Sequence, residues 1–258
     1  MKKLKIIAGP CLAESKEILT QSIEHLLNIC NKYNNIDFYF KASYKKANRT
    51  SAGSFTGAGD EIALQWFNDI RKEYKIKMLT DVHSTEEVQI ASKSVDVLQI
   101  PAFLCRQTEL LTSAGQTGLP VNIKKGQFIA PDDMKKAAEK IIIAGNKNVW
   151  LTERGTCFGY HDLVVDFRSL IIMREYGYPV IYDATHSVQQ PSIGEQSGGN
   201  PQFIFPLAKA AITTGIDGIF FETHPNPNEA KSDSKTQISL ADAEKFIDMV
   251  VNMWEFLL

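Results

Sequence analysis

Short apolar runs rich in β-branched residues alternate along the chain with longer stretches whose apolar residues recur at helical spacing. The short runs predict strands, and nearly every one is apolar at its start and polar at its carboxyl end. The predicted strands are Leu4–Ala8, Phe38–Ala42, Lys77–Asp81, Val97–Ile100, Pro120–Lys124, Val149–Thr152, Pro179–Asp183 and Gly218–Glu222.

The longer stretches predict amphipathic helices between these strands. In the first of them, Ile18, Ile23 and Leu26 fall at helical spacing, and Ser15 precedes them as an N-cap would. Pro131 suits the first turn of a later helix. The predicted helices are Ser15–Tyr33, Asp60–Tyr74, Pro131–Ala144, Leu163–Tyr176, Pro201–Thr214 and Ser239–Phe256.

About eight βα units in succession imply a parallel sheet with helical cover. A chain of 258 residues with this count predicts one domain, a closed (β/α)₈ TIM barrel over residues 1–258. An open, doubly wound sheet is the alternative. No G-x-G-x-x-G follows the first strand, which disfavours a dinucleotide-binding version of that fold.

Composition and charge exclude several classes of function. A net charge of −2 disfavours nucleic-acid binding, which needs a basic face, and no apolar run is long enough to span a membrane. The basic and briefly apolar N-terminus reaches Gly9-Pro10 too early for a signal peptide. The four cysteines form no C-x-x-C pair, which favours reduced thiols. We therefore expect a soluble, cytoplasmic protein.

Functional groups occur at the carboxyl end of nearly every predicted strand. In a barrel these ends meet on one face, where active sites form. Strand ends are generally wetter than strand middles, but that accounts for one or two polar residues and not for a group on every strand. The residues are Cys11, Lys41, Ser43, Asp81, His83, Gln99, Asn122, Lys124, Arg154, Asp183, His186, Glu222 and His224.

Cations form the first set of candidate site residues. Any one of them alone would be an ordinary surface charge, but packed together they repel one another unless anions enter. Arginine binds phosphate or carboxylate in a bidentate way, and lysine acts as a point charge. The set predicts phosphorylated substrates, and it consists of Lys41, Lys46, Arg49, Arg106, Lys124 and Arg154.

Candidate metal ligands form the second set. Cys11, His186, Glu222 and Asp233 follow the first, seventh and eighth strands, which are neighbours in a closed barrel. Thiolate, imidazole and carboxylate together suit a divalent transition metal. The residues form no local motif, so Cys11 as a small buried hydrophobe and His186 as a structural histidine remain open alternatives.

Nine segments give the chain a resemblance to a known enzyme family along essentially its full length. They are I-I-A-G-P-C at 6–11, F-K-A-S-Y-K-K-A-N-R-T-S at 40–51, T-D-V-H at 80–83, Q-I-P-A-F-L-C-R-Q-T at 99–108, N-I-K-K-G-Q-F at 122–128, E-R-G-T-C-F-G-Y at 153–160, L-V-V-D at 163–166, D-A-T-H-S-V-Q at 183–189 and F-E-T-H-P-N-P at 221–227. The chain resembles the 3-deoxy-D-manno-octulosonate 8-phosphate synthases, also called 2-dehydro-3-deoxyphosphooctonate aldolases. K-A-N-R at 46–49 is the most specific segment, because the related DAHP synthases of the aromatic pathway typically carry K-P-R-[ST] there.

The resemblance implies two substrates. It implies that phosphoenolpyruvate is held by Lys41, Lys46, Lys124 and Arg154, in a pocket shaped by Asp81, Gln99 and Phe103. It implies that arabinose 5-phosphate is bound by Asn48, Arg49 and Thr50, with Arg106 reaching its phosphate across a subunit boundary of a homotetramer. Asn200-Pro201-Gln202 lacks the arginine often found there in the family, with an effect on substrate affinity that the sequence leaves open.

The resemblance also implies a metal and a reaction. The metal-dependent branch of the family has cysteine at position 11, so Cys11, His186, Glu222 and Asp233 imply a divalent ion, with Fe, Zn, Mn and Co left open. In the implied reaction, carbon 3 of phosphoenolpyruvate attacks the aldehyde, water adds to carbon 2 and phosphate leaves. Lys46, His186 and Asp233 are candidate proton carriers, in no order.

Three other functions stay open at this stage. One is a Schiff-base aldolase using Lys124, a lysine at a strand end. Another is a DAHP-type condensation with erythrose 4-phosphate. The third is a barrel that binds phosphosugars without catalysis, which the complete ring of polar residues disfavours.

Overall fold

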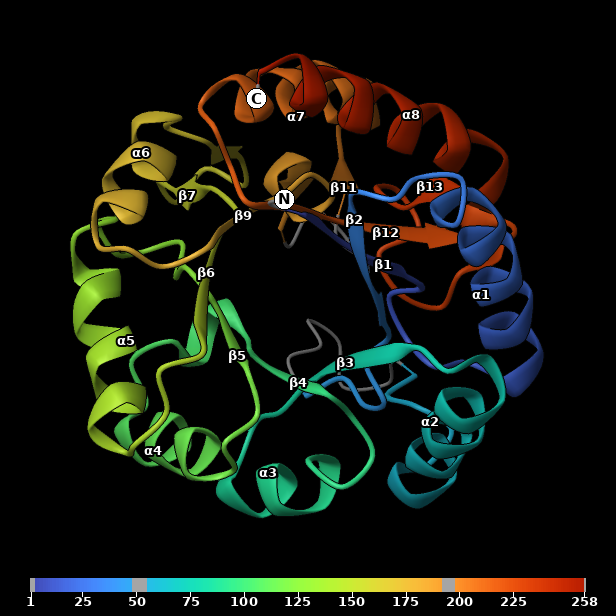
Figure 1. Cartoon of the computed structure of the whole chain (residues 1–258), viewed down its shortest axis with the longest axis horizontal. Helices are drawn as coiled ribbons and strands as arrows, with labels where there is room; N and C mark the ends of the chain where they lie inside the picture. Colours follow the sequence, from blue (N-terminus) through green and yellow to red (C-terminus); the bar gives the residue numbers. More distant parts are fainter. Residues whose placement is uncertain (1–2, 48–54, 192–197, 258) are drawn as a thin grey trace.

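Eight parallel strands close into a barrel in this computed structural model, which describes residues 3–47, 55–191 and 198–257. The last strand pairs with the first in parallel, from Lys5 opposite Gly218 to Gly9 opposite Glu222. This closure confirms the predicted TIM barrel and rules out the open sheet (Figure 1). The barrel strands are β1 (Leu4–Gly9), β2 (Ile36–Lys41), β3 (Lys77–Asp81), β4 (Val97–Ile100), β5 (Val121–Lys124), β6 (Val149–Glu153), β9 (Val180–Asp183) and β12 (Gly218–His224).

A ring of helices surrounds the barrel, one after each strand (Figure 1). Ser15 caps the first helix as predicted, because its Oγ accepts the backbone N–H of Ile18 at 3.2 Å. In the part of the chain that the structure describes, no helix is long and apolar enough to cross a lipid bilayer. The helices are α1 (Lys16–Cys30), α2 (Asp60–Tyr74), α3 (Thr85–Ala91), α4 (Thr108–Gln116), α5 (Asp133–Ile143), α6 (Arg168–Glu175), α7 (Ile204–Thr213) and α8 (Leu240–Phe256).

One predicted helix begins later than its sequence pattern indicated. Leu163–Val164 forms a strand, β8, that pairs antiparallel with β7 (Thr156–Cys157), and α6 begins only at Arg168. The prediction of a helix from Leu163 was wrong because Val164 and Val165 are β-branched and favour extended backbone. The other short elements are η1 (Ala102–Leu104), η2 (His186–Val188), β10 (Gln189–Gln190), β11 (Gly198–Gly199), η3 (Pro201–Phe203), η4 (Pro227–Glu229) and β13 (Ile238–Ser239).

Apolar side chains fill the barrel itself, separately from the larger core between strands and helices. Tyr39 and Trp150 meet edge to face inside it, with ring centroids 5.0 Å apart. The barrel interior is therefore a packed apolar core, and the polar functional groups lie at the carboxyl ends of the strands. The interior cluster is Ile7, Tyr39, Leu79, Val97, Trp150, Ile181 and Phe220.

Candidate active site

The polar residues at the carboxyl ends of the strands line one cavity at the mouth of the barrel. This cavity brings together predicted site residues that come from β2, β3, β4, β5, β6 and β9 or directly follow them. The convergence expected from the sequence is thus present in the fold. The lining residues are Lys41, Lys46, Asp81, Gln99, Pro101, Ala102, Phe103, Lys124, Arg154 and His186.

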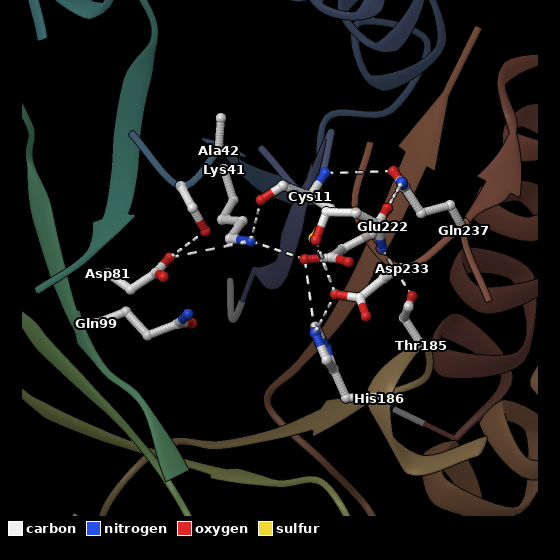
Figure 2. Close-up of polar contacts among 12 residues, drawn as sticks. Cys11, Lys41, Ala42, Asp81, Gln99, Thr185, His186, Glu222, Asp233 and Gln237 are labelled. Carbon is white, nitrogen blue, oxygen red and sulfur yellow. Dashed lines mark hydrogen bonds and ion pairs between the residues drawn. The ribbon is translucent and has the colours of Figure 1, made fainter. Parts of the chain in front are cut away.

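Three of the predicted metal ligands meet beside this cavity. One ligand atom from each of Cys11, Glu222 and Asp233 lies within 4.8 Å of the others, and Cys11 Sγ is 3.0 Å from Asp233 Oδ2 (Figure 2). Gly9, just before Cys11, lets the end of β1 lie close to the end of β2, because its φ is 154° and a Cβ there would lie 2.2 Å from the carbonyl oxygen of Lys41. Asp233 has a left-handed φ of 48°, a conformation that aspartate tolerates better than most residues.

The imidazole of His186 completes this group from the next strand. Its Nε2 lies 3.6 Å from Glu222 Oε1 and 4.0 Å from Asp233 Oδ2. Its Nδ1 lies 2.8 Å from Asp183 Oδ2. A carboxylate that accepts the Nδ1 proton leaves Nε2 as a lone-pair donor, which is the arrangement of a metal-binding histidine.

The chemistry of these side chains fits a divalent cation. Glu222 is fully buried, and its Oε2 has no hydrogen-bond partner among the described residues. Burial raises the pKa of Glu222, but the charges of Lys41 and His186 outweigh it and lower the pKa to about 2. Burial, together with Asp233 and Glu222, raises the pKa of the Cys11 thiol well above its usual value. A bound divalent cation would stabilise the thiolate that these surroundings oppose.

Hydrogen bonds between side chains and backbone groups hold the segments that carry these ligands in place. The side-chain amide of Gln237 accepts the N–H of Cys11 at 3.2 Å and donates to the carbonyl oxygen of Ser232 at 2.8 Å. The N–H of Glu222 donates to Thr185 Oγ1 at 2.8 Å. Sequence patterns alone assign no role to Gln237, because it lies in the loop after the last barrel strand with no motif linking it to Cys11.

Buried cations form the other half of the site. Lys41 Nζ donates to Glu222 Oε1 at 2.7 Å, and Lys124 Nζ lies 2.5 Å from Asp183 Oδ2. Arg154 donates through Nη2 to Gln189 Oε1 at 3.2 Å, but its buried Nη1 has no partner within the described residues. A buried guanidinium N–H without an acceptor is costly, so an anion from a ligand is the natural partner.

Burial and neighbouring charges have opposite effects on the pKa values of Lys124 and Lys46. Burial lowers the pKa of Lys124, and Asp183 does not fully offset it. Burial also lowers the pKa of Lys46, but the surrounding acidic groups, Cys11 first and then Asp81 and Glu222, raise it well above the ordinary value. Lys46 is therefore an ammonium at neutral pH, and Lys124 loses its proton more readily than a free lysine.

The opposite wall of the cavity consists of hydrogen-bonded polar side chains. Asp81 accepts from Ser43 Oγ at 2.7 Å. Thr152 donates to Asn122 at 2.6 Å, and Asn122 donates to Gln99 Oε1 at 3.1 Å. Figure 2 shows Asp81 and Gln99 across from His186, with Lys41 between Asp81 and Glu222.

The remaining predicted residues lie at the rim of this cavity, apart from it or outside the described chain. Asn48, Arg49 and Thr50 fall among residues that the structure does not describe. Phe103 is at the rim and 54% exposed. Arg106 is exposed and does not line the cavity of its own chain.

A TIM barrel with buried cations at its mouth, next to a cluster of side chains suited to binding a metal ion, is typical of an enzyme that acts on anionic substrates. Comparison with known proteins narrows this class. The model of the DAHP synthetase I family matches residues 2–258, and the chain belongs to this family.

Several curated relatives are similar over nearly the whole chain, and each is named a 2-dehydro-3-deoxyphosphooctonate aldolase. The protein from Trichlorobacter lovleyi is 50% identical over 93% of this chain and 88% of its own length. The protein from Bartonella tribocorum is 49% identical over 96% and 89%. The protein from Campylobacter jejuni strain 81116 is 48% identical over 98% and 97%.

Proposed function

We propose that this chain condenses phosphoenolpyruvate with D-arabinose 5-phosphate and water, giving 3-deoxy-D-manno-octulosonate 8-phosphate and phosphate for lipopolysaccharide biosynthesis. The observation that carries the proposal is the mouth cavity, where Lys41, Lys124 and Arg154 are buried and a guanidinium N–H lacks a partner among the described residues. The names of the relatives and the K-A-N-R segment at 46–49 support this substrate pair over erythrose 4-phosphate.

Phosphoenolpyruvate carries a phosphate and a carboxylate, so it matches a pocket with several cations. Lys41, Lys46, Lys124 and Arg154 bind it in this proposal, and the wall of Asp81, Gln99 and Phe103 shapes its site. Fixed cations orient the enol phosphate toward the aldehyde and stabilise charge as phosphate departs. Lys46 serves as a positive charge and not as a base, because its raised pKa keeps it protonated.

The second substrate enters from the open side of the cavity. Asn48, Arg49 and Thr50 bind arabinose 5-phosphate in this proposal, and Arg106 of an adjacent chain reaches its phosphate. Arg106 is exposed on its own subunit, which suits a residue that acts on a neighbour. We include a cytoplasmic homotetramer of one-domain chains in the proposal. Light scattering on the purified protein tests the assembly, with four times the chain mass expected and a monomer as the contradicting result.

A divalent metal ion, one of Fe, Zn, Mn or Co, completes the proposed site. Cys11, His186, Glu222 and Asp233 are its ligands. When bound, such an ion supplies Lewis acidity that orients or polarises the aldehyde or positions the water. Asp183 contacts the ring of His186 at Nδ1, and Lys41 contacts Glu222 at Oε1. These contacts orient both proposed ligands and leave His186 Nε2 and Glu222 Oε2 for the metal. As metal ligands, His186 and Asp233 are less available as proton carriers.

One observation favours a second candidate, a Schiff-base aldolase. Lys124 is buried and its pKa is lowered, as a lysine that attacks a carbonyl requires. Its Nζ, however, is engaged by Asp183 at 2.5 Å and lies 3.4 Å from His186 Nδ1. Borohydride treatment in the presence of substrate decides between the two. We expect no adduct on Lys124, and a trapped adduct there would favour the aldolase.

The acceptor sugar tests the proposed function most sharply. Arabinose 5-phosphate and erythrose 4-phosphate are each incubated with phosphoenolpyruvate and enzyme, and the products are identified by mass spectrometry. We expect the eight-carbon product from the pentose and little seven-carbon product from the tetrose. Equal or greater use of erythrose 4-phosphate would overturn the choice of substrate.

A further inference from the structure

A buried ion pair lies directly behind the two strand ends that present Lys124 and Arg154. It joins Lys125 to Glu153, whose side chains are each 1% exposed, with 3.5 Å between Nζ and Oε1. Lys124 and Arg154 line the mouth cavity, whereas Lys125 and Glu153 line a separate cavity with Ser169 of α6. Neighbouring side chains on a strand point to opposite faces, so the ion pair sits on the outer side of the barrel wall.

The carboxylate of Glu153 fixes the turn that carries Arg154. Its Oε1 accepts the N–H of Gly155 at 2.7 Å, which closes the backbone around Arg154. Its Oε2 accepts from Ser169 Oγ, which ties the turn to α6. Gly155 has a φ of 94°, which a residue with a side chain rarely adopts, so this turn requires glycine at position 155.

The ammonium of Lys125 ties the end of β5 to the segment after β6. Its Nζ donates to Thr156 Oγ1 at 3.2 Å and to the carbonyl oxygen of Gly126 at 3.3 Å. Its backbone N–H donates to the carbonyl oxygen of Thr152 at 2.7 Å. These contacts link the two strand ends just beside Lys124 and Arg154.

Stability alone does not account for this pair. Desolvating two charges costs several kcal/mol, and well-packed apolar residues are often as stable as a buried ion pair. Neither residue enters the cavity that we assign to phosphoenolpyruvate. We propose that Lys125 and Glu153 are positioning residues that set the spacing and orientation of Lys124 and Arg154 for phosphoenolpyruvate. This inference rests on the proposed function.

Steady-state kinetics of Lys125→Met, Glu153→Gln and the double variant test the inference. Each single change leaves a buried group unpaired and shifts one strand end. We expect KM for phosphoenolpyruvate to rise on the order of 10-fold and kcat to fall with it, with KM for arabinose 5-phosphate changed less than about 3-fold. In the double variant the rise should be smaller than the product of the two single effects, because the residues act as a unit.

Asn146 offers a matched control at the opposite end of the same two strands. Its side chain is 4% exposed, donates to the carbonyl oxygen of Leu119 before β5 and accepts the N–H of Asn148 before β6. Asn146→Ala should lower the melting temperature and leave KM for phosphoenolpyruvate within about 2-fold of wild type. This separates loss of stability from loss of positioning.

Ser169→Ala keeps both charges and decides the question if the charge variants do not fold. It removes only the hydroxyl that holds Glu153, and a rise in KM for phosphoenolpyruvate of about 3-fold is expected. Unchanged KM in the folded variants, with only the melting temperature lowered, overturns the inference. Wild-type enzyme that releases no phosphate from the substrate pair would instead overturn the proposed function, so the two failures are distinguishable.

Discussion

At the scale of single residues, Cys11 is surrounded by oxygen atoms. This thiol is fully buried, and its Sγ lies 3.0 Å from Asp233 Oδ2 and 3.1 Å from Ser232 Oγ. A structural cysteine usually packs against carbon, so these surroundings favour a ligand over the small-hydrophobe alternative.

Cys11→Asn replaces this thiol with a neutral amide. We expect the metal content of the purified protein to fall to about one-tenth or less, because the thiolate is the softest donor of the set. Atomic emission measures the metal per chain. Cys157→Ser, at a half-buried thiol away from the cluster, should retain the wild-type content. Equal metal content in Cys11→Asn and wild type would rule out the ligand assignment.

Asp183 acts on two site residues at once. It is fully buried and contacts both His186 Nδ1 and Lys124 Nζ. Asp183→Asn should weaken metal binding by about 10- to 100-fold, since the partner that orients the imidazole becomes a poorer acceptor. Competition with a chromogenic chelator measures the affinity. Asp166→Asn, on an exposed loop, is the control, and an unaltered affinity in Asp183→Asn would contradict the orienting role.

At the scale of elements, the strand predictions agree with the structure because continuous apolar runs are distinctive. β3 and β4 begin and end at the predicted residues. α3 and α4, of 7 and 9 residues, were not among the helices named from sequence, because short helices leave little periodicity to detect.

The same contrast holds for the site. Lys124 and Arg154 could be placed at the mouth because both sit at strand ends. The role of Gln237 and the pairing of Asp183 with Lys124 could not, since both depend on contacts between segments far apart in the chain. Only the folded structure brings those segments together.

Helix α3 begins with a cluster that makes stability depend on pH. Glu87 accepts from His83 Nδ1 at 2.8 Å and pairs with Lys45 at 3.0 Å. Burial raises the pKa of Glu87, but these partners outweigh it and lower the pKa from 4.5 to about 2. A lowered pKa in the folded state means that the stabilisation is present above about pH 4.5 and is lost as the pH falls through about 2.

Glu87→Gln removes that charge. We expect the free energy of unfolding to fall by about 1–3 kcal/mol at neutral pH, with the difference from wild type shrinking as the pH is lowered from about 4.5 toward about 2. Urea unfolding across this range measures it. Glu61→Gln, at an exposed position in the first turn of α2, should change stability by less than about 0.5 kcal/mol. A difference independent of pH would show that the charge of Glu87 is not responsible.

At the scale of the whole molecule, the barrel separates stability from chemistry. Its apolar interior and helical ring hold the strands, while the carboxyl ends present buried cations next to the candidate metal ligands, as Lys41 lies next to Glu222 (Figure 2). Because the apolar interior and the helical ring stabilise the fold, the mouth of the barrel can hold buried charges.

Phosphate release from phosphoenolpyruvate tests this central claim most directly. The enzyme is assayed with phosphoenolpyruvate alone, with arabinose 5-phosphate added, and with both substrates after treatment with a chelator. We expect release only when both substrates are present, loss of release with the chelator, and recovery when a divalent metal is restored. Release without the sugar phosphate, or none under any condition, would contradict the proposed condensation, and release unaffected by the chelator would contradict the metal site.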